Sequence, residues 1–107
     1  MHRASQHDIW QDLRSLAYFG ICDCERKLND FDSAIAYCQK ALTYDDKDPY
    51  AHYSLGLSYL HKALAANETG DLDPALRHLR AVVALNPDMD EAKIAQQNIA
   101  NIEKALR

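Results

Sequence analysis

The chain alternates between stretches with helical apolar spacing and short polar breaks. Within each stretch, apolar residues recur at steps of three and four, which places them on one face of an α-helix. The breaks are rich in Asn, Asp and Pro, which favour turns and helix starts. The pattern predicts five helices, over about 8–28, 33–44, 49–66, 74–85 and 91–106. Because the breaks are short, we expect an antiparallel helical stack and an all-α fold.

The apolar stripe of each helix predicts which side is buried. In the first helix the stripe comprises Trp10, Leu13, Ala17, Ile21, Cys24 and Leu28. In the last helix it comprises Ala92, Ala95, Ile99, Ile102 and Leu106, opposite a polar side of Lys93, Gln96, Gln97, Asn101 and Lys104. We therefore expect both stripes to face the core, and the last helix to keep one wet side.

Helix starts are marked by Asp and Pro. Asp32 and Asp48 precede the second and third helices, where a carboxylate can accept hydrogen bonds from free backbone N–H groups. Asp73 stands in the same place before the fourth helix. Pro49 and Pro74 then occupy the first helical position, where a missing N–H costs nothing. These residues predict helices that begin at 33, 49 and 74.

Two segments of the chain repeat each other, residues 29–44 and 70–85. Both have Asp at the second and fourth positions and Ala at the sixth. Their apolar positions also coincide, with Phe31, Ile35, Cys38, Ala41, Leu42 and Tyr44 in the first and Leu72, Leu76, Leu79, Val82, Val83 and Leu85 in the second. The helices that precede them align too, since Ile21 matches Leu55. A repeated helix pair indicates a solenoid.

This repeat resembles the tetratricopeptide repeat, a helix–turn–helix unit of about 34 residues. The family signature places a large residue, a Leu-Gly pair and a Tyr in the first helix. Two small residues flank an aromatic one in the second helix, and a Pro follows. The second unit fits with His52, Leu55, Gly56, Tyr59, Ala75, Leu79, Val82 and Pro87. The first fits with Tyr18, Ile21, Cys22, Ala34, Cys38 and Ala41, but has Glu25 in place of the Tyr and Asp46 in place of the Pro.

The resemblance implies one solenoid domain over residues 1–107. Repeat one would cover 15–48, with an extension of its first helix from about 8, and repeat two would cover 49–89. Residues 90–107 would form a capping helix, because Gln96 and Gln97 stand where a Leu-Gly pair would be. A cap is needed because the last hairpin of a solenoid otherwise exposes apolar surface.

Repeat two carries a seven-residue insertion. The turn Gly normally follows the Tyr by four residues, but after Tyr59 it comes at Gly70, seven residues late. Seven residues are about two helical turns, so the phase of the helix is nearly kept. We expect the third helix to overrun the hairpin and to project His61, Leu64 and Ala65 beyond it.

Members of this family are protein-binding modules whose first helices line a concave groove. The matching groove positions are Leu16, Phe19, Asp23, Arg26, Tyr50, Tyr53, Leu57, Leu60, Ile94 and Asn98. Phe19, Tyr53 and Leu57 would form an apolar floor for a peptide or helix of another protein. One subclass clamps C-terminal carboxylates through Lys and Asn, but Phe19 and Asp23 occupy those positions. Alternatively, the groove residues pack on one another or on the last helix.

Composition and charge exclude several classes of partner. The net charge of −4 argues against nucleic acid and anionic membranes. The sequence has neither a signal-peptide core nor an apolar run of membrane-spanning length, so we expect a cytoplasmic protein. The cysteines are Cys22, Cys24 and Cys38, an odd count that does not suit a disulfide framework. We expect them to be buried, reduced thiols.

Candidate chemistry is sparse. The five histidines, His2, His7, His52, His61 and His78, lack the spacing of three or four that pairs metal ligands on a helix. The glycines are scattered and build no phosphate loop. We therefore expect no catalytic site, no metal and no cofactor. The leading interpretation is a protein-interaction scaffold. The alternative is a self-association module, in which surplus apolar surface on the long helices joins two copies as a homodimer.

Overall fold

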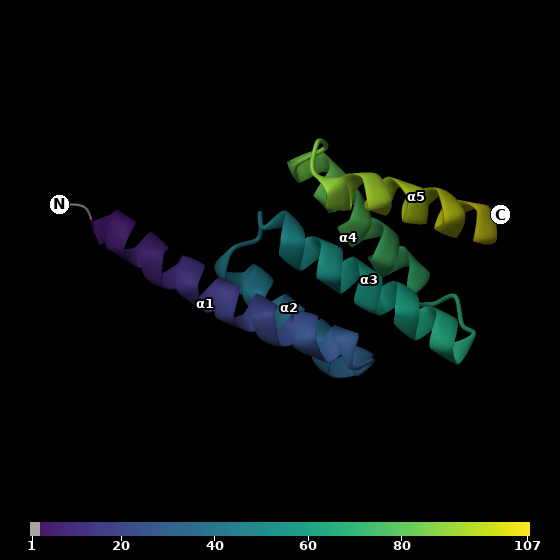
Figure 1. The fold of residues 1–107 in the computed structure, drawn as a ribbon, viewed down its shortest axis with the longest axis horizontal. Coiled ribbons are helices and arrows are strands. Elements are labelled where there is room, and N and C mark those ends of the chain that lie inside the picture. Colours follow the sequence, from purple (N-terminus) through teal and green to yellow (C-terminus); the bar gives the residue numbers. More distant parts are fainter. Residues whose placement is uncertain (1–2) are drawn as a thin grey trace.

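The computed structural model describes residues 3–107, with side chains from Ile9 onward, and this part of the chain contains five α-helices and no β-strand (Figure 1). They are α1 (Arg3–Lys27), α2 (Phe31–Tyr44), α3 (Pro49–Ala66), α4 (Leu72–Leu85) and α5 (Asp90–Ala105). The prediction of an all-α fold with five helices is therefore confirmed. The side chains of His2 and His7 lie outside the described part.

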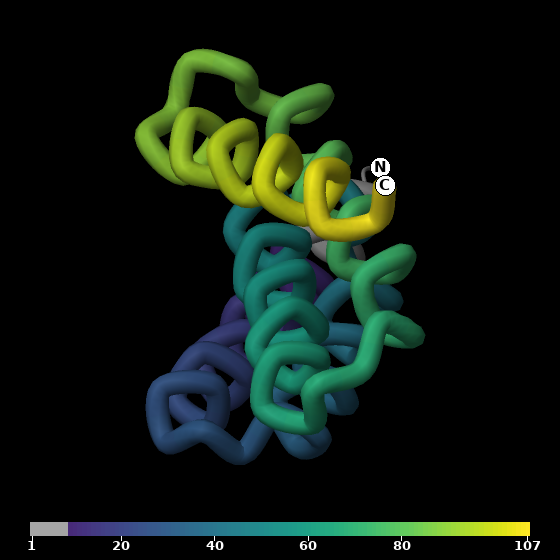
Figure 2. The backbone as a smooth tube through the Cα atoms, turned by 90° about the vertical axis from the view of Figure 1, so that its right-hand side faces the viewer, coloured from purple at the N-terminus to yellow at the C-terminus, as the bar shows by residue number. Residues whose placement is uncertain are grey.

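Consecutive helices run antiparallel and form a stack (Figures 1 and 2). α1 packs against α2, α3 against α4, and α2 and α4 each contact the helix that follows. Figure 1 shows α1, α3 and α5 on the near side, with α2 and α4 behind them. This arrangement is the helix–turn–helix solenoid that the resemblance implied.

Three helices begin at least two residues earlier than the sequence predicted, the first of them α1, which starts at Arg3 rather than near residue 8. α3 starts at Pro49, as expected, and the Asp48 carboxylate caps it by accepting a hydrogen bond of 2.9 Å from a backbone N–H. α2 and α4 start at Phe31 and Leu72, two residues before the expected positions. The first N–H groups of a helix have no intrahelical acceptor, so Pro74 is tolerated anywhere in the first turn.

The expected overrun of α3 is confirmed, because α3 continues to Ala66. Leu64 and Ala65 are exposed on the additional turns. His61 does not project as expected. It packs on Phe31 of α2, with 5.7 Å between the ring centroids, and is half-buried. Lys62 beside it lies 2.8 Å from the Asp32 carboxylate of α2. The insertion thus contributes two residues to the contact with α2 and leaves the next turn open.

The apolar stripe of α1 faces away from the domain, contrary to expectation. Trp10, Leu13 and Leu28 are all more than half exposed. The inward face instead carries Ser15 and Cys22, which are fully or almost fully buried. The Ser15 hydroxyl donates to the Ala41 carbonyl at 3.0 Å. Small polar residues on this face allow α1 to approach α2 closely, so burial here follows side-chain size rather than hydrophobicity.

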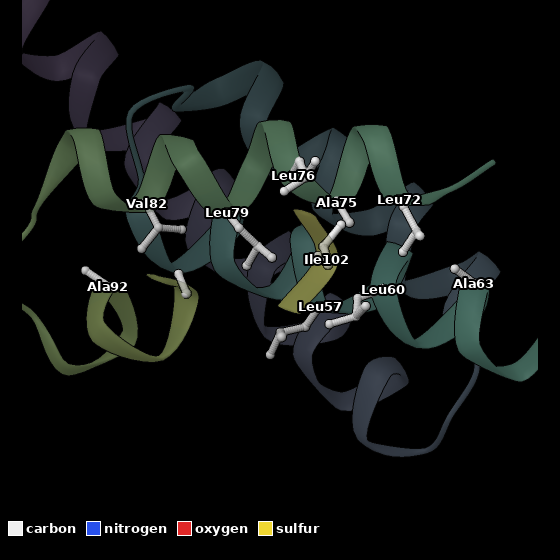
Figure 3. Packing of buried hydrophobic residues seen from close by; sticks show 11 residues of the cluster. Leu57, Leu60, Ala63, Leu72, Ala75, Leu76, Leu79, Val82, Ala92 and Ile102 are labelled. Atoms are coloured by element: carbon white, nitrogen blue, oxygen red, sulfur yellow. The ribbon is translucent and has the colours of Figure 1, made fainter. Parts of the chain in front are cut away.

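The main core lies between α3, α4 and α5 (Figure 3). Its buried members are Leu57, Leu60, Ala63, Leu72, Ala75, Leu76, Leu79, Val82, Ala92, Ala95 and Ile102. The stripe of α5 is therefore buried as expected in its first part, whereas Leu106 is 42% exposed because it lies just beyond the helix end. The polar side of α5 is exposed throughout. α5 thus presents a wet outer surface at this end of the stack.

A smaller core joins α1, α2 and α3 and contains a disulfide. Cys22 and Cys38 are bonded, with 5.2 Å between their Cα atoms, and both are fully buried. The expectation of three reduced, buried thiols is wrong, since Cys24 is also exposed. The expectation rested on the odd number of cysteines and did not consider a bond between Cys22 and Cys38. The family alignment already placed Cys22 and Cys38 at interior positions of the same hairpin, where they meet.

The close contact of α3 with α4 at Gly56 gives a prediction about stability. A Cβ at Gly56 would lie 2.8 Å from Leu79 Cγ and 3.3 Å from the Ala75 carbonyl oxygen. Leu79 is fully buried and cannot move aside. We expect Gly56→Ala to lower the free energy of unfolding by ~1–2 kcal/mol, because overpacking outweighs the gain in helix propensity.

Gly20→Ala is the matched control for Gly56→Ala. Gly20 also lies inside a helix, but a Cβ there has no neighbour within 4 Å. We expect this variant to gain up to ~1 kcal/mol from helix propensity when both variants are measured at a concentration at which the chain is monomeric. Urea denaturation of both variants provides the measurement. Equal effects in the two variants would show that the contact at Gly56 is unimportant.

The disulfide gives a second prediction. It spans 16 residues between Cys22 and Cys38, and closing a loop of that length stabilises a fold by ~3 kcal/mol through the unfolded chain. Reduction should therefore lower the urea midpoint, and Cys38→Ser should abolish the effect of reductant. Alkylation of the native protein without reductant should label Cys24 alone. Labelling of all three cysteines would contradict the bond.

Candidate partner-binding groove

The predicted groove residues belong to α1, α3 and α5, the helices on the near side of Figure 1. Aromatic side chains gather where α1 meets the start of α3. Phe19 packs on Tyr50 with 6.4 Å between the ring centroids, and Tyr50 is 50% exposed. Tyr53 is half-buried one turn further along α3. On α5, Ile94 is 50% exposed. This face therefore offers apolar and aromatic surface to solvent.

An ion pair within α1 is tied to α3 by a hydrogen bond beside these rings. Arg26 donates to the Asp23 carboxylate at 2.7 Å, and its Nε donates to the Ser54 hydroxyl of α3 at 3.0 Å. Lys27 lies 3.0 Å from the second Asp23 oxygen. Burial alone would raise the pKa of Asp23, but the hydrogen bonds from Arg26 and Lys27 outweigh it and hold the pKa below its usual range. Arg26 is thus engaged inside the protein.

Two of the expected groove residues are covered. Leu57 and Leu60 are 8% and 9% exposed and belong to the core between α3, α4 and α5. They pack as the alternative interpretation described, so the aromatic floor depends on Phe19, Tyr50 and Tyr53. Tyr53 lies near Arg26 and Glu91 and is partly buried, and the burial raises the pKa of its phenol.

An apolar cavity that sequence reasoning missed lies between the inserted turns of α3 and the end of α5. Its volume is about 210 Å³. The lining residues are Leu60, Leu64, Leu72, Asn98, Asn101, Ile102 and Ala105. Leu64 is 67% exposed at its rim. The sequence did contain a signal for this cavity. Leu64 follows Leu57 by seven residues, so the two side chains lie on nearly the same face of the helix.

Two histidines meet between α3 and α4. His52 Nε2 lies 2.8 Å from the Asp46 carbonyl oxygen, which can only accept, so this nitrogen carries a proton. Nδ1 of neutral His52 is then an acceptor, and His78 Nδ1 donates to it over 3.0 Å. The His78 ring also stacks on Tyr59 at 6.1 Å. Burial, reinforced by repulsion from His52 and Arg77, lowers the pKa of His78 to about 4.

The histidine pair joins two helices. Within the described residues, no group of three or more His, Cys, Asp or Glu side chains is placed to hold a metal ion. Both ring nitrogens of His52 and Nδ1 of His78 have hydrogen-bond partners. The Tyr59 ring stacks on the His78 ring. The two rings therefore tie α3 to α4, which agrees with the large side chain expected at position 52.

None of the described helices is long and apolar enough to cross a bilayer. A family model for the tetratricopeptide repeat matches residues 16–48 and 56–89, more than half of the chain. No curated protein matches the chain. The unmatched residues 49–55 are seven in number and form the first two turns of α3.

The histidine pair predicts acid sensitivity. Since the folded state lowers the pKa of His78, the unfolded chain binds a proton more readily than the folded one. The stabilisation is complete above the ordinary His pKa of ~6.5 and is lost as the pH falls toward 4. Burial also lowers the pKa of His61, which acts in the same sense.

We expect the melting temperature to fall between pH 6.5 and 4, and His78→Gln to flatten that slope. His61→Gln serves as the comparison, because His61 lies outside the pair. Melting curves followed by circular dichroism at several pH values provide the measurement. A slope that persists unchanged in His78→Gln would assign the acid sensitivity to other groups.

Proposed function

Because the chain belongs to the tetratricopeptide repeat family, whose repeats generally mediate protein–protein interaction, we propose that it binds a segment of a partner protein on the face formed by α1, α3 and α5. The observation that carries the proposal is the exposed Tyr50 ring lying on Phe19 at the mouth of this face. Exposed aromatic side chains on a concave surface are typical anchors of peptide recognition.

The chemistry of the face favours an apolar anchor in the partner. Leu16, Tyr50 and Ile94 are each at least half exposed, whereas the cation nearest to the rings, Arg26, is neutralised by Asp23. A carboxylate ligand would have to compete with Asp23 for Arg26. We therefore propose a peptide or helix that inserts aromatic or aliphatic side chains between Phe19, Tyr50 and Tyr53.

A scaffold role without catalysis fits this proposal. The family is typically non-enzymatic, and the ionisable groups of the face are already engaged in the contact between α1 and α3. The cytoplasmic location, the lack of a cofactor and the exclusion of nucleic acid stay predictions from the sequence. The alternative function, self-association, is favoured by an exposed apolar face of α1 that shares Leu16 with the groove face.

Selection from a displayed random-peptide library on the immobilised protein tests the proposal. We expect selected peptides to be rich in Phe, Trp, Leu and Ile, and Tyr50→Ala to weaken their binding at least tenfold, as for a hot-spot residue. Phe19→Ala and Tyr53→Ala should act in the same direction. Leu85→Ala is the matched control, because it removes an exposed apolar side chain from α4.

Titration of the selected peptides by fluorescence anisotropy gives the affinities. Circular dichroism must show that each variant is folded, since Phe19 and Tyr53 are partly buried. Affinities that are equal in Tyr50→Ala, Leu85→Ala and the natural sequence would reject the groove as the binding site. Competition among peptides from separate selections would show that they share one site.

A further inference from the structure

One face of α1 is apolar and covered by nothing in the described part of the chain. It lies opposite Ser15 and Cys22, the residues that α1 buries. Its large side chains are exposed by 57% at Ile9, 60% at Trp10, 52% at Leu13, 62% at Leu16, 42% at Ile21 and 74% at Leu28. The small residues Ala17, Gly20 and Cys24 lie among them. We call this set of nine residues the α1 face.

The α1 face is long enough to form an interface. From Trp10 to Leu28 it extends over five helical turns, or ~27 Å. Soluble monomers rarely expose a continuous apolar patch of more than a few hundred Å². At the middle of the face, Ala17 and Gly20 allow a second helix to approach closely, and no atom lies within 4 Å of a Cβ built on Gly20.

The two ends of the stack differ in character. At the other end, α5 turns Lys93, Gln96, Gln97 and Lys104 to solvent. An apolar surface at one end alone can be covered by the same surface of a second copy, and the outer ends of the resulting pair are then polar. Contacts that are identical on both partners close around a two-fold axis and do not propagate.

The charges beside the α1 face are complementary in such a pair. Asp12 and Lys27 lie along one edge of the face, and Arg14 and Glu25 lie along the other. The two pairs are centred on the same point of the helix, between Phe19 and Gly20. When a second α1 runs antiparallel about that point, Asp12 faces Lys27 of the second copy. In the same register, Arg14 faces Glu25 of the second copy.

We propose that the protein forms a closed homodimer in which the α1 faces of two copies pack antiparallel, with the two-fold axis near Gly20. The interface buries Trp10, Leu13, Ile21 and Leu28 of both copies and is edged by four ion pairs. The interface shares Leu16 with the groove face but leaves out the Phe19–Tyr50 contact that carries the groove proposal.

Sedimentation equilibrium of the protein gives the first test. We expect a mass of twice 12.1 kDa at micromolar concentration. Ala17→Arg buries an unpaired charge at the centre of the interface and should weaken the dimer by at least ~100-fold. Leu85→Arg, an exposed position on α4, is the matched control and should leave the mass unchanged. A monomer of the natural sequence, or an open series of larger species, would overturn the proposal.

A charge-reversal cycle tests the antiparallel register. Arg14→Glu and Glu25→Arg should each weaken the dimer by roughly tenfold, because each places like charges together twice. The double variant should restore the affinity, since the reversed charges face each other again. In a parallel pair, Arg14 would instead face Asp12 and Glu25 would face Lys27, so the double variant would not recover.

The cycle also separates dimerisation from stability. Arg14 lies 5.9 Å above the Tyr44 ring within the same copy, and Arg14→Glu removes that contact. Glu25→Arg cannot restore it, so recovery of the dimer in the double variant can come only from the contact between copies. A double variant as weak as Arg14→Glu alone would reject the register. Tyr50→Ala should leave the mass unchanged. The experiments can therefore reject peptide binding in the groove without rejecting the dimer, and the reverse.

Discussion

The contact between α3 and α4 at Gly56 is the constraint on which the rest of the stack depends. Without a side chain at this position, Leu79 can lie directly against the α3 backbone. The two helices are then close enough for Ala75 and Ala63 to be buried between them, and α5 packs on the layer that results. The position of α5 in turn decides which groove residues stay accessible. Burial of Leu57 and exposure of Ile94 both follow from it.

The insertion in α3 preserves this contact because it comes in a multiple of the helical period. Seven residues turn the helix through nearly two full revolutions, so side chains beyond the insertion keep the direction of those before it. Leu64 thus continues the line of Leu57 along the helix. An insertion of five or six residues would rotate the end of α3 and break its packing on Leu72. The consequence is a helix that is longer rather than redirected, with an apolar cavity between its end and α5.

Much of the fold could be predicted because the signals are local. The Asp48–Pro49 start, the repeated segments and the length of α3 depend on neighbouring residues alone. The burial of α1 could not be predicted in the same way. Its larger stripe looked like the core side, but the partners of α1 select the small residues Ser15 and Cys22 for the inward face. A stripe shows that a face prefers an apolar environment and does not identify the surface that provides it.

The candidate site was predictable to a similar extent. Family positions selected Phe19 and Tyr50, whose rings meet in the structure, and their part in binding stays a prediction. They could not show that α5 covers Leu57, because the tilt of a capping helix depends on packing between distant segments. The histidine pair was missed for the same reason, since His52 and His78 are 26 residues apart. Long-range contacts of this kind are determined by the assembled stack.

The disulfide in the first hairpin also determines the direction in which the stack comes apart. Solenoids are held together by contacts between neighbouring units, so their ends fray first and the loss propagates inward. The bond between Cys22 and Cys38 fastens one end covalently, whereas α5 at the other end is held by packing and by the exposed Arg80–Glu103 ion pair. In an oxidising medium the structure should loosen from α5 toward α1. Reduction frees the opposite end, so the redox state of one buried bond selects which part of the chain a protease reaches first.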